Sequence, residues 1–305
     1  MGRVRRTAAM LLACALGIGL SLGATPGWWT RAEAASGGAE RDPAPAQRVV
    51  SINPSLTAIL VDLGASELLV GVDDFSARQE PTVAALPRVG GLYDPSLETV
   101  VALRPDLVVL VPSAQQRDFR ERLEAVGIPV LAFDPKSLED VLASIESIGE
   151  RVGRLGAARE RVAAIRAEKA RVEKSSAGRP RPRTVLVLQR EPLYVVGAGS
   201  FIDDMLRASG AENLAAVLPD LYPRAGLEWL LAARPELILD ASPDAEPPGR
   251  YWARWPSLPA VASGRVERVE AGLVTLPGPR LDRALDALAT AVQGSSATTA
   301  REGPP

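Results

Sequence analysis

An internal repeat constrains the fold of this chain more than any other feature of its sequence. The segment Leu97–Val109 reads LETVVALRPDLVV, and the segment Leu227–Leu239, 130 residues later, reads LEWLLAARPELIL. Leu, Glu, Ala, Arg, Pro and Leu stand at the same places in both, and most other pairs are conservative. Each segment predicts a short helix that ends before a proline and is followed by an apolar strand. We therefore expect two halves built on a similar plan.

Both halves alternate short apolar runs with helical patterns, which is typical of α/β folds. The run 107–111 is unbroken, as in strands buried on both faces of a parallel sheet. Strands are expected at 49–52, 69–72, 107–111, 129–133, 184–188, 237–240 and 265–269. The sequence therefore predicts an α/β protein with two similar Rossmann-like lobes, 48–136 and 183–293. A ligand cleft is expected between them, because domain interfaces and the carboxyl ends of parallel strands are preferred ligand sites.

One long α-helix is expected to join the lobes over residues 137–173. Apolar residues keep helical spacing through this segment and no proline interrupts them, although Gly149, Gly153 and Gly156 allow for a bend. Since a single helix between lobes is stiffer than crossing strands, we expect small lobe motion rather than wide hinge closure.

Residues 1–34 are interpreted as a secretory signal peptide. Three arginines among the first six residues precede an apolar run, and the AEA motif at 32–34 fits a cleavage site. An uncleaved membrane anchor is the alternative, and LLAC, ending at Cys14, offers a weak site for a lipid anchor. Residues 35–47 are expected to form a flexible leader and residues 294–305 a disordered tail. A periplasmic location follows.

Histidine is absent and the formal net charge is −2. The chain therefore cannot build a Ser-His-Asp triad, a Cys-His pair or a histidine metal site, and its charge disfavours nucleic acid as a partner. Asp73 with Asp74, or Asp203 with Asp204, are the remaining candidates for a hydrolase that uses paired carboxylates. Adjacent acids rarely converge, and acids in a first helical turn are explained by the helix dipole. We expect no enzymatic activity, no catalytic residues and no metal site.

The repeat places Glu98 and Glu228 equivalently, each in the first turn of a helix. The helix dipole favours a carboxylate there by about 0.3–1 kcal/mol, which needs no function. The alternative is docking, because matched acids on two lobes suit a two-fold partner that carries arginines. The residues alone leave both interpretations open.

Ordered motifs in residues 48–293 resemble the helical-backbone periplasmic receptors for cobalamin, ferric siderophores and haem. These motifs are RVVSINPSLTAIL from Arg48, LGA from Leu63, LVGV from Leu69, LPRVGG from Leu86, the unit 97–107, GAGSFIDDML from Gly197 and PGPRL from Pro277. Within the family, YWARWPSL from Tyr251, followed by PGPR, is similar to the cobalamin receptors. The resemblance implies the solute-binding component of an ABC importer, with cobalamin as its solute. A ferric-siderophore or haem receptor is the alternative.

The resemblance also implies partners for this chain. It implies a permease dimer with a cytoplasmic ATPase, a monomeric receptor, and no cofactor besides the bound ligand. It further implies that Glu98 and Glu228 are the carboxylates, one per lobe, that pair with arginines of the permease.

Aromatic residues are the candidates for ligand contact, by resemblance and by position, with core packing as the alternative for each ring. These candidates are Phe75, Tyr93, Tyr194, Phe201 and Tyr222. The sequence departs from the family pattern at Leu92 and near 273–275, where relatives can carry aromatic residues. An anionic ferric chelate would instead use Arg78, Arg190 or Arg224, and haem iron would use Tyr93 or Tyr222.

Overall fold

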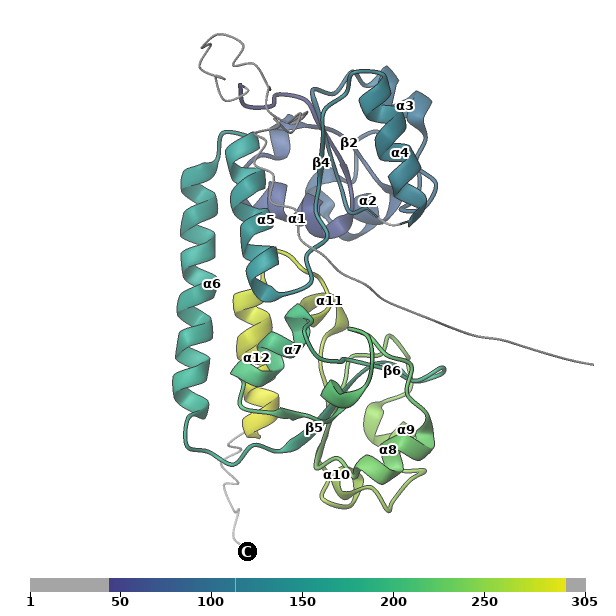
Figure 1. Ribbon diagram of the computed structural model, residues 1–305, viewed down its shortest axis with the longest axis vertical. Helices are drawn as coiled ribbons and strands as arrows, with labels where there is room; N and C mark the ends of the chain where they lie inside the picture. Colours follow the sequence, from purple (N-terminus) through teal and green to yellow (C-terminus); the bar gives the residue numbers. More distant parts are fainter. Residues whose placement is uncertain (1–43, 113, 295–305) are drawn as a thin grey trace, which may run out of the picture. The chain divides into compact units, whose positions relative to one another are not determined.

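The structure, a computed structural model, describes residues 44–112 and 114–294 of the 305-residue chain. The predicted signal peptide 1–34 lies outside the described residues. So do residues 35–43 of the predicted leader and 295–305 of the predicted tail. Each lobe is built around its own sheet, as Figure 1 shows in blue and in green. The prediction of a two-lobed α/β protein is confirmed.

The sheet of the N-terminal lobe is entirely parallel, with the order β2-β1-β3-β4. Its strands are β1 (Val49–Ile52), β2 (Leu69–Val72), β3 (Leu107–Leu110) and β4 (Val130–Ala132). Every residue of the two central strands is buried, which explains why β3 is an unbroken apolar run and why β1 is apolar except for Ser51. The helices are α1 (Pro54–Asp62), α2 (Asp74–Gln79), α3 (Leu97–Ala102) and α4 (Ala114–Ala125), with short 3₁₀ turns η1 (Ser66–Leu68) and η2 (Pro81–Val83).

The sheet of the C-terminal lobe has the order β6-β5-β8-β9, with β7 also paired to β5. All pairs are parallel except β5 with β6. The strands are β5 (Arg183–Gln189), β6 (Tyr194–Val195), β7 (Glu212–Asn213), β8 (Leu237–Asp240) and β9 (Val266–Arg268). The helices are α7 (Phe201–Ala208), η3 (Leu214–Val217), α8 (Leu227–Ala233), α9 (Pro248–Trp252), α10 (Pro259–Ala262), α11 (Ala271–Val274) and α12 (Leu281–Gln293).

The segment 137–173 forms two helices rather than the single connecting helix that its periodicity predicts. α5 (Leu138–Arg151) begins at a capping box made by Ser137 and Asp140, and α6 (Leu155–Ser176) follows after three residues. Gly153 makes the turn with a φ of +68°. The helices then lie side by side, as Figure 1 shows. Helical spacing of apolar residues cannot separate one long helix from two antiparallel helices joined by so short a turn.

The sequence repeat is also a structural repeat. Leu97–Ala102 and Leu227–Ala233 are helices α3 and α8, and they lead into the central strands β3 and β8. The arginine before each proline has a left-handed backbone, with φ of +48° at Arg104 and +49° at Arg234. The acid that follows each proline also has the same kind of hydrogen-bond partner in the two lobes. Asp106 accepts the backbone N–H of Arg48, and Glu236 accepts that of Arg183.

Arg48, which directly precedes β1, and Arg183, the first residue of β5, also use their side chains in the same way in the two lobes. The Arg48 guanidinium donates to the backbone oxygens of Leu103 and Arg104, and the Arg183 guanidinium donates to that of Ala233. In both lobes an arginine therefore caps the carboxyl end of the repeated helix, where the helix dipole favours a cation.

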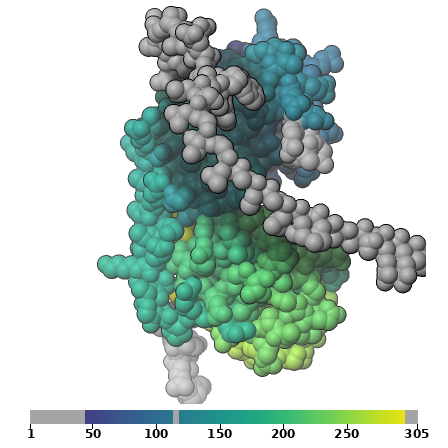
Figure 2. All heavy atoms as spheres, in the orientation of Figure 1, coloured from purple at the N-terminus to yellow at the C-terminus, as the bar shows by residue number. Residues whose placement is uncertain are grey.

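One apolar core cluster runs through both lobes and the helices between them, and each lobe has a further, smaller cluster of its own. The shared cluster includes Ile59 of α1, Ile145 of α5, Ile165 of α6 and Leu285 of α12, all fully buried. Figure 2 shows α5 and α6 in teal alongside both the blue and the green lobe. The lobes therefore share buried apolar surface rather than meeting only through a linker.

Polar contacts reinforce this shared core. Arg161 of α6 pairs with Asp282 of α12 and lies 3.7 Å from a carboxylate oxygen of Asp62 on α1. Burial raises the pKa of Asp62, and the nearby Arg161 opposes that shift. The Leu138 N–H donates to Asp204 of α7 over 2.9 Å, which ties α5 to the C-terminal lobe.

The close contact between α5 and α6 yields a test on stability. A Cβ at Gly149 would lie 2.4 Å from the Cβ of Ala158, so Gly149→Ala is expected to lower the free energy of unfolding by about 1–3 kcal/mol. Gly156→Ala is the matched control, since a Cβ there meets no atom within 4 Å, and a gain of about 0.4–1 kcal/mol is expected. Urea unfolding measures both. Equal gains at the two positions would contradict the observed packing.

Candidate functional site

The carboxyl ends of the strands in the N-terminal lobe carry a buried polar network. Asp73 follows β2 and caps α2, accepting the backbone N–H groups of Phe75 at 2.8 Å and Ser76 at 3.0 Å. Its other oxygen accepts the Ser76 hydroxyl. The Thr57 hydroxyl lies 2.9 Å from that of Ser76 and 2.8 Å from that of Ser51. These four polar side chains are buried, so the network fixes the first turn of α2 and with it the backbone of Phe75.

The ring of Phe75 is held in this place with 40% of the residue exposed. The Arg78 guanidinium stacks 4.5 Å from the ring centroid. A flat ring backed by a cation is therefore presented at the edge of the sheet where ligands of parallel α/β folds bind. Of the arginines considered for an anionic chelate, Arg78 is the one that stacks on a candidate ligand ring.

The other aromatic candidates divide into exposed and buried side chains. Tyr93 is 67% exposed and lies in the loop before α3, and Tyr222 is 39% exposed and lies in the loop before α8. Tyr194 is half-buried at the start of β6, where it pairs with Gln189 at the carboxyl end of β5. Phe201 is only 3% exposed and belongs to the shared core. The expectation that Phe201 contacts the ligand is therefore corrected, because its buried ring offers almost no surface to a ligand.

The hydroxyl of Tyr222 is shielded although part of the residue is exposed. Burial raises the pKa of Tyr222 to about 12, and a hydrogen bond to Ser200 acts in the opposite direction. Ser200 also caps α7 by accepting the backbone N–H of Asp203. In the C-terminal lobe the helix-capping residue Ser200 therefore positions Tyr222, much as the helix-capping residue Asp73 positions Phe75 in the N-terminal lobe.

The paired acids considered for hydrolysis are used in the framework. Asp73 is the buried cap of α2, while the backbone N–H of its neighbour Asp74 donates to Gly90. Asp203 is buried and accepts from Gly199 and Asn213. Arg207 pairs with both acids, since its Nε lies 3.1 Å from Asp203 and its Nη2 contacts Asp204, which also accepts the Leu138 N–H. Asp203 and Asp204 are thus neutralised by one arginine and tied to the framework, and Asp73 is tied to the start of α2.

Glu98 and Glu228 occupy matching positions, one in the first turn of α3 and the other in the first turn of α8. Both are exposed, and within residues 44–112 and 114–294 neither forms an ion pair or a hydrogen bond through its carboxylate. Ser96 already caps α3 by accepting the Thr99 N–H. The carboxylates are therefore left available to another molecule.

Arg190 has a structural role in the C-terminal lobe. It follows β5, is 4% exposed, and its Nε lies 3.0 Å from Asp240 at the end of β8. Asp240 also accepts from the Trp252 indole at 2.7 Å and from Ser242. Sequence reasoning missed Asp240, since one acid at the end of an apolar strand gives no signal of its partners. This buried pair makes Arg190 a poor candidate for contact with a ferric chelate, whereas Arg224 is exposed.

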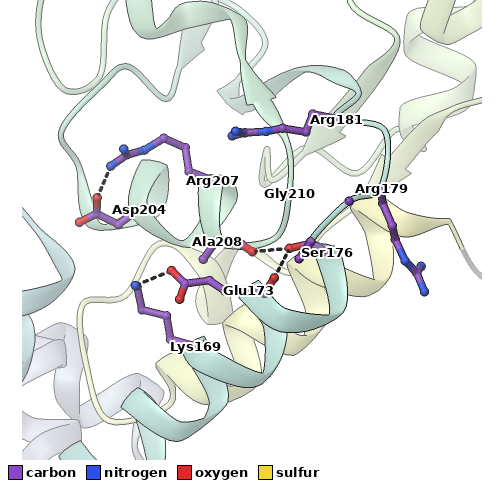
Figure 3. Close-up of a pocket in the computed structure, with 11 residues that line it drawn as sticks. Lys169, Glu173, Ser176, Arg179, Arg181, Asp204, Arg207, Ala208 and Gly210 are labelled. Carbon is purple, nitrogen blue, oxygen red and sulfur yellow. Dashed lines mark hydrogen bonds and ion pairs between the residues drawn. The ribbon is translucent and has the colours of Figure 1, made fainter.

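A hollow of about 580 Å³ lies between the end of α6 and α7 (Figure 3). Its charged side chains are engaged with the protein itself. Lys169 pairs with Glu173, Arg207 pairs with Asp204, and Arg181 donates to the Ala211 carbonyl. No aromatic residue lines it. These side chains satisfy acids and helix-end carbonyls, so the hollow does not have the lining expected of a solute site.

Residues 44–112 and 114–294 contain neither a cluster of metal-ligating side chains nor a membrane-spanning helix. In that part of the chain no three or more acids or cysteines gather where they could hold a metal ion. No helix there has the length and apolar character needed to cross a membrane.

Comparisons with known proteins agree with this architecture. A family model described as "Periplasmic binding protein" matches residues 49–268. A vitamin B12-binding protein of Vibrio parahaemolyticus is 27% identical over 244 residues, covering 77% of this chain and 86% of that protein.

Two solved structures share the fold. The periplasmic vitamin B12 binding protein of Vibrio cholerae superimposes with a TM-score of 0.73 at 22% identity, covering 82% of this chain and 97% of the other. A periplasmic haem binding protein of Pseudomonas aeruginosa gives 0.66 at 28% identity, covering 81% and 92%.

The shielding of Tyr222 can be tested by alkaline titration of tyrosinate absorbance. The difference between the wild type and Tyr222→Phe is expected to have its midpoint near pH 12, compared with about 10 for an ordinary tyrosine. Because the folded state holds this proton more tightly than the unfolded chain, the associated stability is complete below pH 10 and is lost as the pH rises towards 12. A midpoint near 10 would show that the hydroxyl is not shielded.

Proposed function

This chain belongs to the periplasmic binding protein family, and we propose that it captures cobalamin outside the cytoplasm and delivers it to the permease of an ABC importer. The exposure of Phe75, Tyr93 and Tyr222 is the observation that carries the proposal. Exposed rings normally cost free energy in water, and a broad corrin face would cover them. The names of the B12-binding relatives support the same ligand.

The two lobes contribute to this surface in different ways. The N-terminal lobe offers Phe75 and Tyr93, and the C-terminal lobe offers Tyr222 and Tyr194, the latter bridged to Arg224 two residues after Tyr222. Covering these rings requires little rearrangement, because Asp73 and Ser200 already hold the segments that carry two of them. No covalent step is needed, and in the absence of histidine the protein cannot offer an imidazole to cobalt.

Haem is the second candidate for the ligand. The haem binding protein of Pseudomonas aeruginosa is 28% identical to this chain, and Tyr93 presents a phenol that is 67% exposed. A tyrosine oxygen is a known axial ligand of haem iron. Haem and cobalamin therefore compete for the same aromatic surface in this proposal, and direct binding separates them.

Calorimetric titration with cyanocobalamin, haem and a ferric chelate tests the ligand. Cyanocobalamin is expected to bind most tightly, and Phe75→Ala or Tyr222→Ala is each expected to weaken it at least about tenfold, since a buried ring contributes about 1.5–3 kcal/mol. Val217→Ala is the control, because Val217 is 82% exposed and was not a ligand candidate. Tighter binding of haem, with loss of its absorption band in Tyr93→Phe, would favour the haem receptor instead.

Glu98 and Glu228 are proposed to dock the receptor on the permease, each pairing with arginine. The double variant Glu98→Ala, Glu228→Ala is expected to abolish transport in a reconstituted importer while leaving ligand affinity unchanged. Glu121→Ala with Glu267→Ala removes one exposed acid from each lobe elsewhere and serves as the matched control. If ligand affinity fell in the first variant, the docking role would be wrong.

A further inference from the structure

A second hollow, of about 380 Å³, lies directly beside Glu228. Three segments surround it: the turn from β5 to β6, the loop that leads into α8, and the residues around the end of α9. Its lining includes Glu191, Arg224, Gly226, Glu228, Tyr251 and Trp255. The hollow therefore contains one of the two proposed docking acids and adds aromatic surface to it.

Three aromatic rings line this hollow. The Tyr251 centroid lies 5.0 Å from that of Trp252 and 5.5 Å from that of Trp255, and the two indoles are 5.7 Å apart. The cluster is anchored from beneath, because Trp252 donates to the buried Asp240. This aromatic wall is therefore rigid, and a side chain that binds to it requires no rearrangement of the rings.

The Arg190 guanidinium supports the same wall from the protein interior. It lies 4.6 Å from the Tyr251 centroid, and the Arg254 guanidinium lies 4.7 Å from it. Since both arginines are already stacked on Tyr251, the half-buried Trp255 is the ring left with surface for another cation.

The charges of the side chains that line this hollow favour the binding of a cation. The buried pair of Arg190 with Asp240 is neutral as a unit. Glu191 and Glu228 are exposed, and neither is ion-paired in the part of the chain that the structure describes. Arg224 is the one exposed cation in the lining. Two carboxylates therefore remain against a single positive charge.

The N-terminal lobe has no counterpart to this aromatic wall in the repeat. The segment that follows β3, residues 111–129, contains one aromatic residue, Phe119, which is buried, whereas the segment that follows β8, residues 241–265, contains Tyr251, Trp252 and Trp255. The segment after β3 thus provides Glu98 with no aromatic wall like the one beside Glu228. The two corners of the receptor are equivalent in their carboxylates and unequal in their surroundings.

We propose that this hollow receives an arginine side chain of the permease, which stacks on Trp255 while its guanidinium pairs with Glu228. Arginine fits because its planar guanidinium both stacks on aromatic rings and pairs with carboxylates through two hydrogen bonds. The inference rests on the proposed docking role of Glu228 and adds a consequence to it. The C-terminal lobe provides more of the docking affinity than the N-terminal lobe.

The test measures binding of the receptor to its permease–ATPase complex in lipid nanodiscs. Trp255→Ala is expected to weaken docking at least about tenfold, and Trp255→Phe to restore it to within about threefold, since phenylalanine still offers a ring. Glu228→Ala is expected to cost more affinity than Glu98→Ala. Cyanocobalamin affinity, measured in parallel, should not change in any of them.

A second pair of variants fills the hollow without removing a ring. A Cβ at Gly226 would lie 3.0 Å from a carboxylate oxygen of Glu228, the mobile end of a side chain, so both Gly226→Ala and Gly226→Leu displace that carboxylate. Only leucine also occupies the hollow. Gly226→Leu is therefore expected to weaken docking at least about tenfold relative to Gly226→Ala, a difference that remains measurable if Trp255→Ala folds poorly.

The outcomes separate the two proposals. If Glu228→Ala weakens docking while Gly226→Leu binds like Gly226→Ala, the hollow is empty in the complex and this inference is overturned, but the docking role stands. If neither Glu98→Ala nor Glu228→Ala weakens docking, the proposed docking role fails and the inference fails with it.

Discussion

The apolar core that α5, α6 and α12 share with both lobes is the interaction on which the rest of this structure depends. A wide hinge motion would divide this shared core, and each buried side chain that it exposed would cost about 1.5–3 kcal/mol. Arg161 adds a polar tie, since it reaches acids on α1 and α12. The two lobes are therefore held near one relative position, and a solute must find its binding surface largely formed.

Because the separation of the lobes is fixed, the repeated helices α3 and α8 also keep fixed positions. Glu98 and Glu228 stand on α3 and α8, and each helix is held at its far end by an arginine from the neighbouring strand. The same device in both lobes sets the two carboxylates in equivalent local frames. A two-fold symmetric partner could meet both at once. The hollow beside Glu228 breaks this equivalence, so the proposed docking combines a symmetric pair of charges with an asymmetric aromatic contact.

Much of the fold could be predicted because the repeat and the buried strands are local signals. The strand pattern and the helix from Ser200 follow from apolar runs and caps that lie close together in sequence. The turn at Gly153 could not be predicted, since the apolar spacing continues on both sides and only a positive φ separates α5 from α6. The aromatic character and position of Phe201 predict ligand contact, whereas tertiary packing places its ring in the core. Asp240 and the hollow beside Glu228 depend on contacts between distant segments, which no local pattern encodes.

Ligand recognition and docking rest on different parts of this framework. The candidate ligand rings stand at helix starts and in loops, where Asp73 fixes the backbone of Phe75 and Ser200 holds the hydroxyl of Tyr222. The docking acids stand on the repeated helices, whose anchors are Arg48 and Arg183. A substitution in the loops that changes which solute binds does not alter the contacts of Arg48 and Arg183. In the proposed function the partner contacts the repeat while the solute contacts the loops, so the same scaffold can present different solutes to one kind of partner.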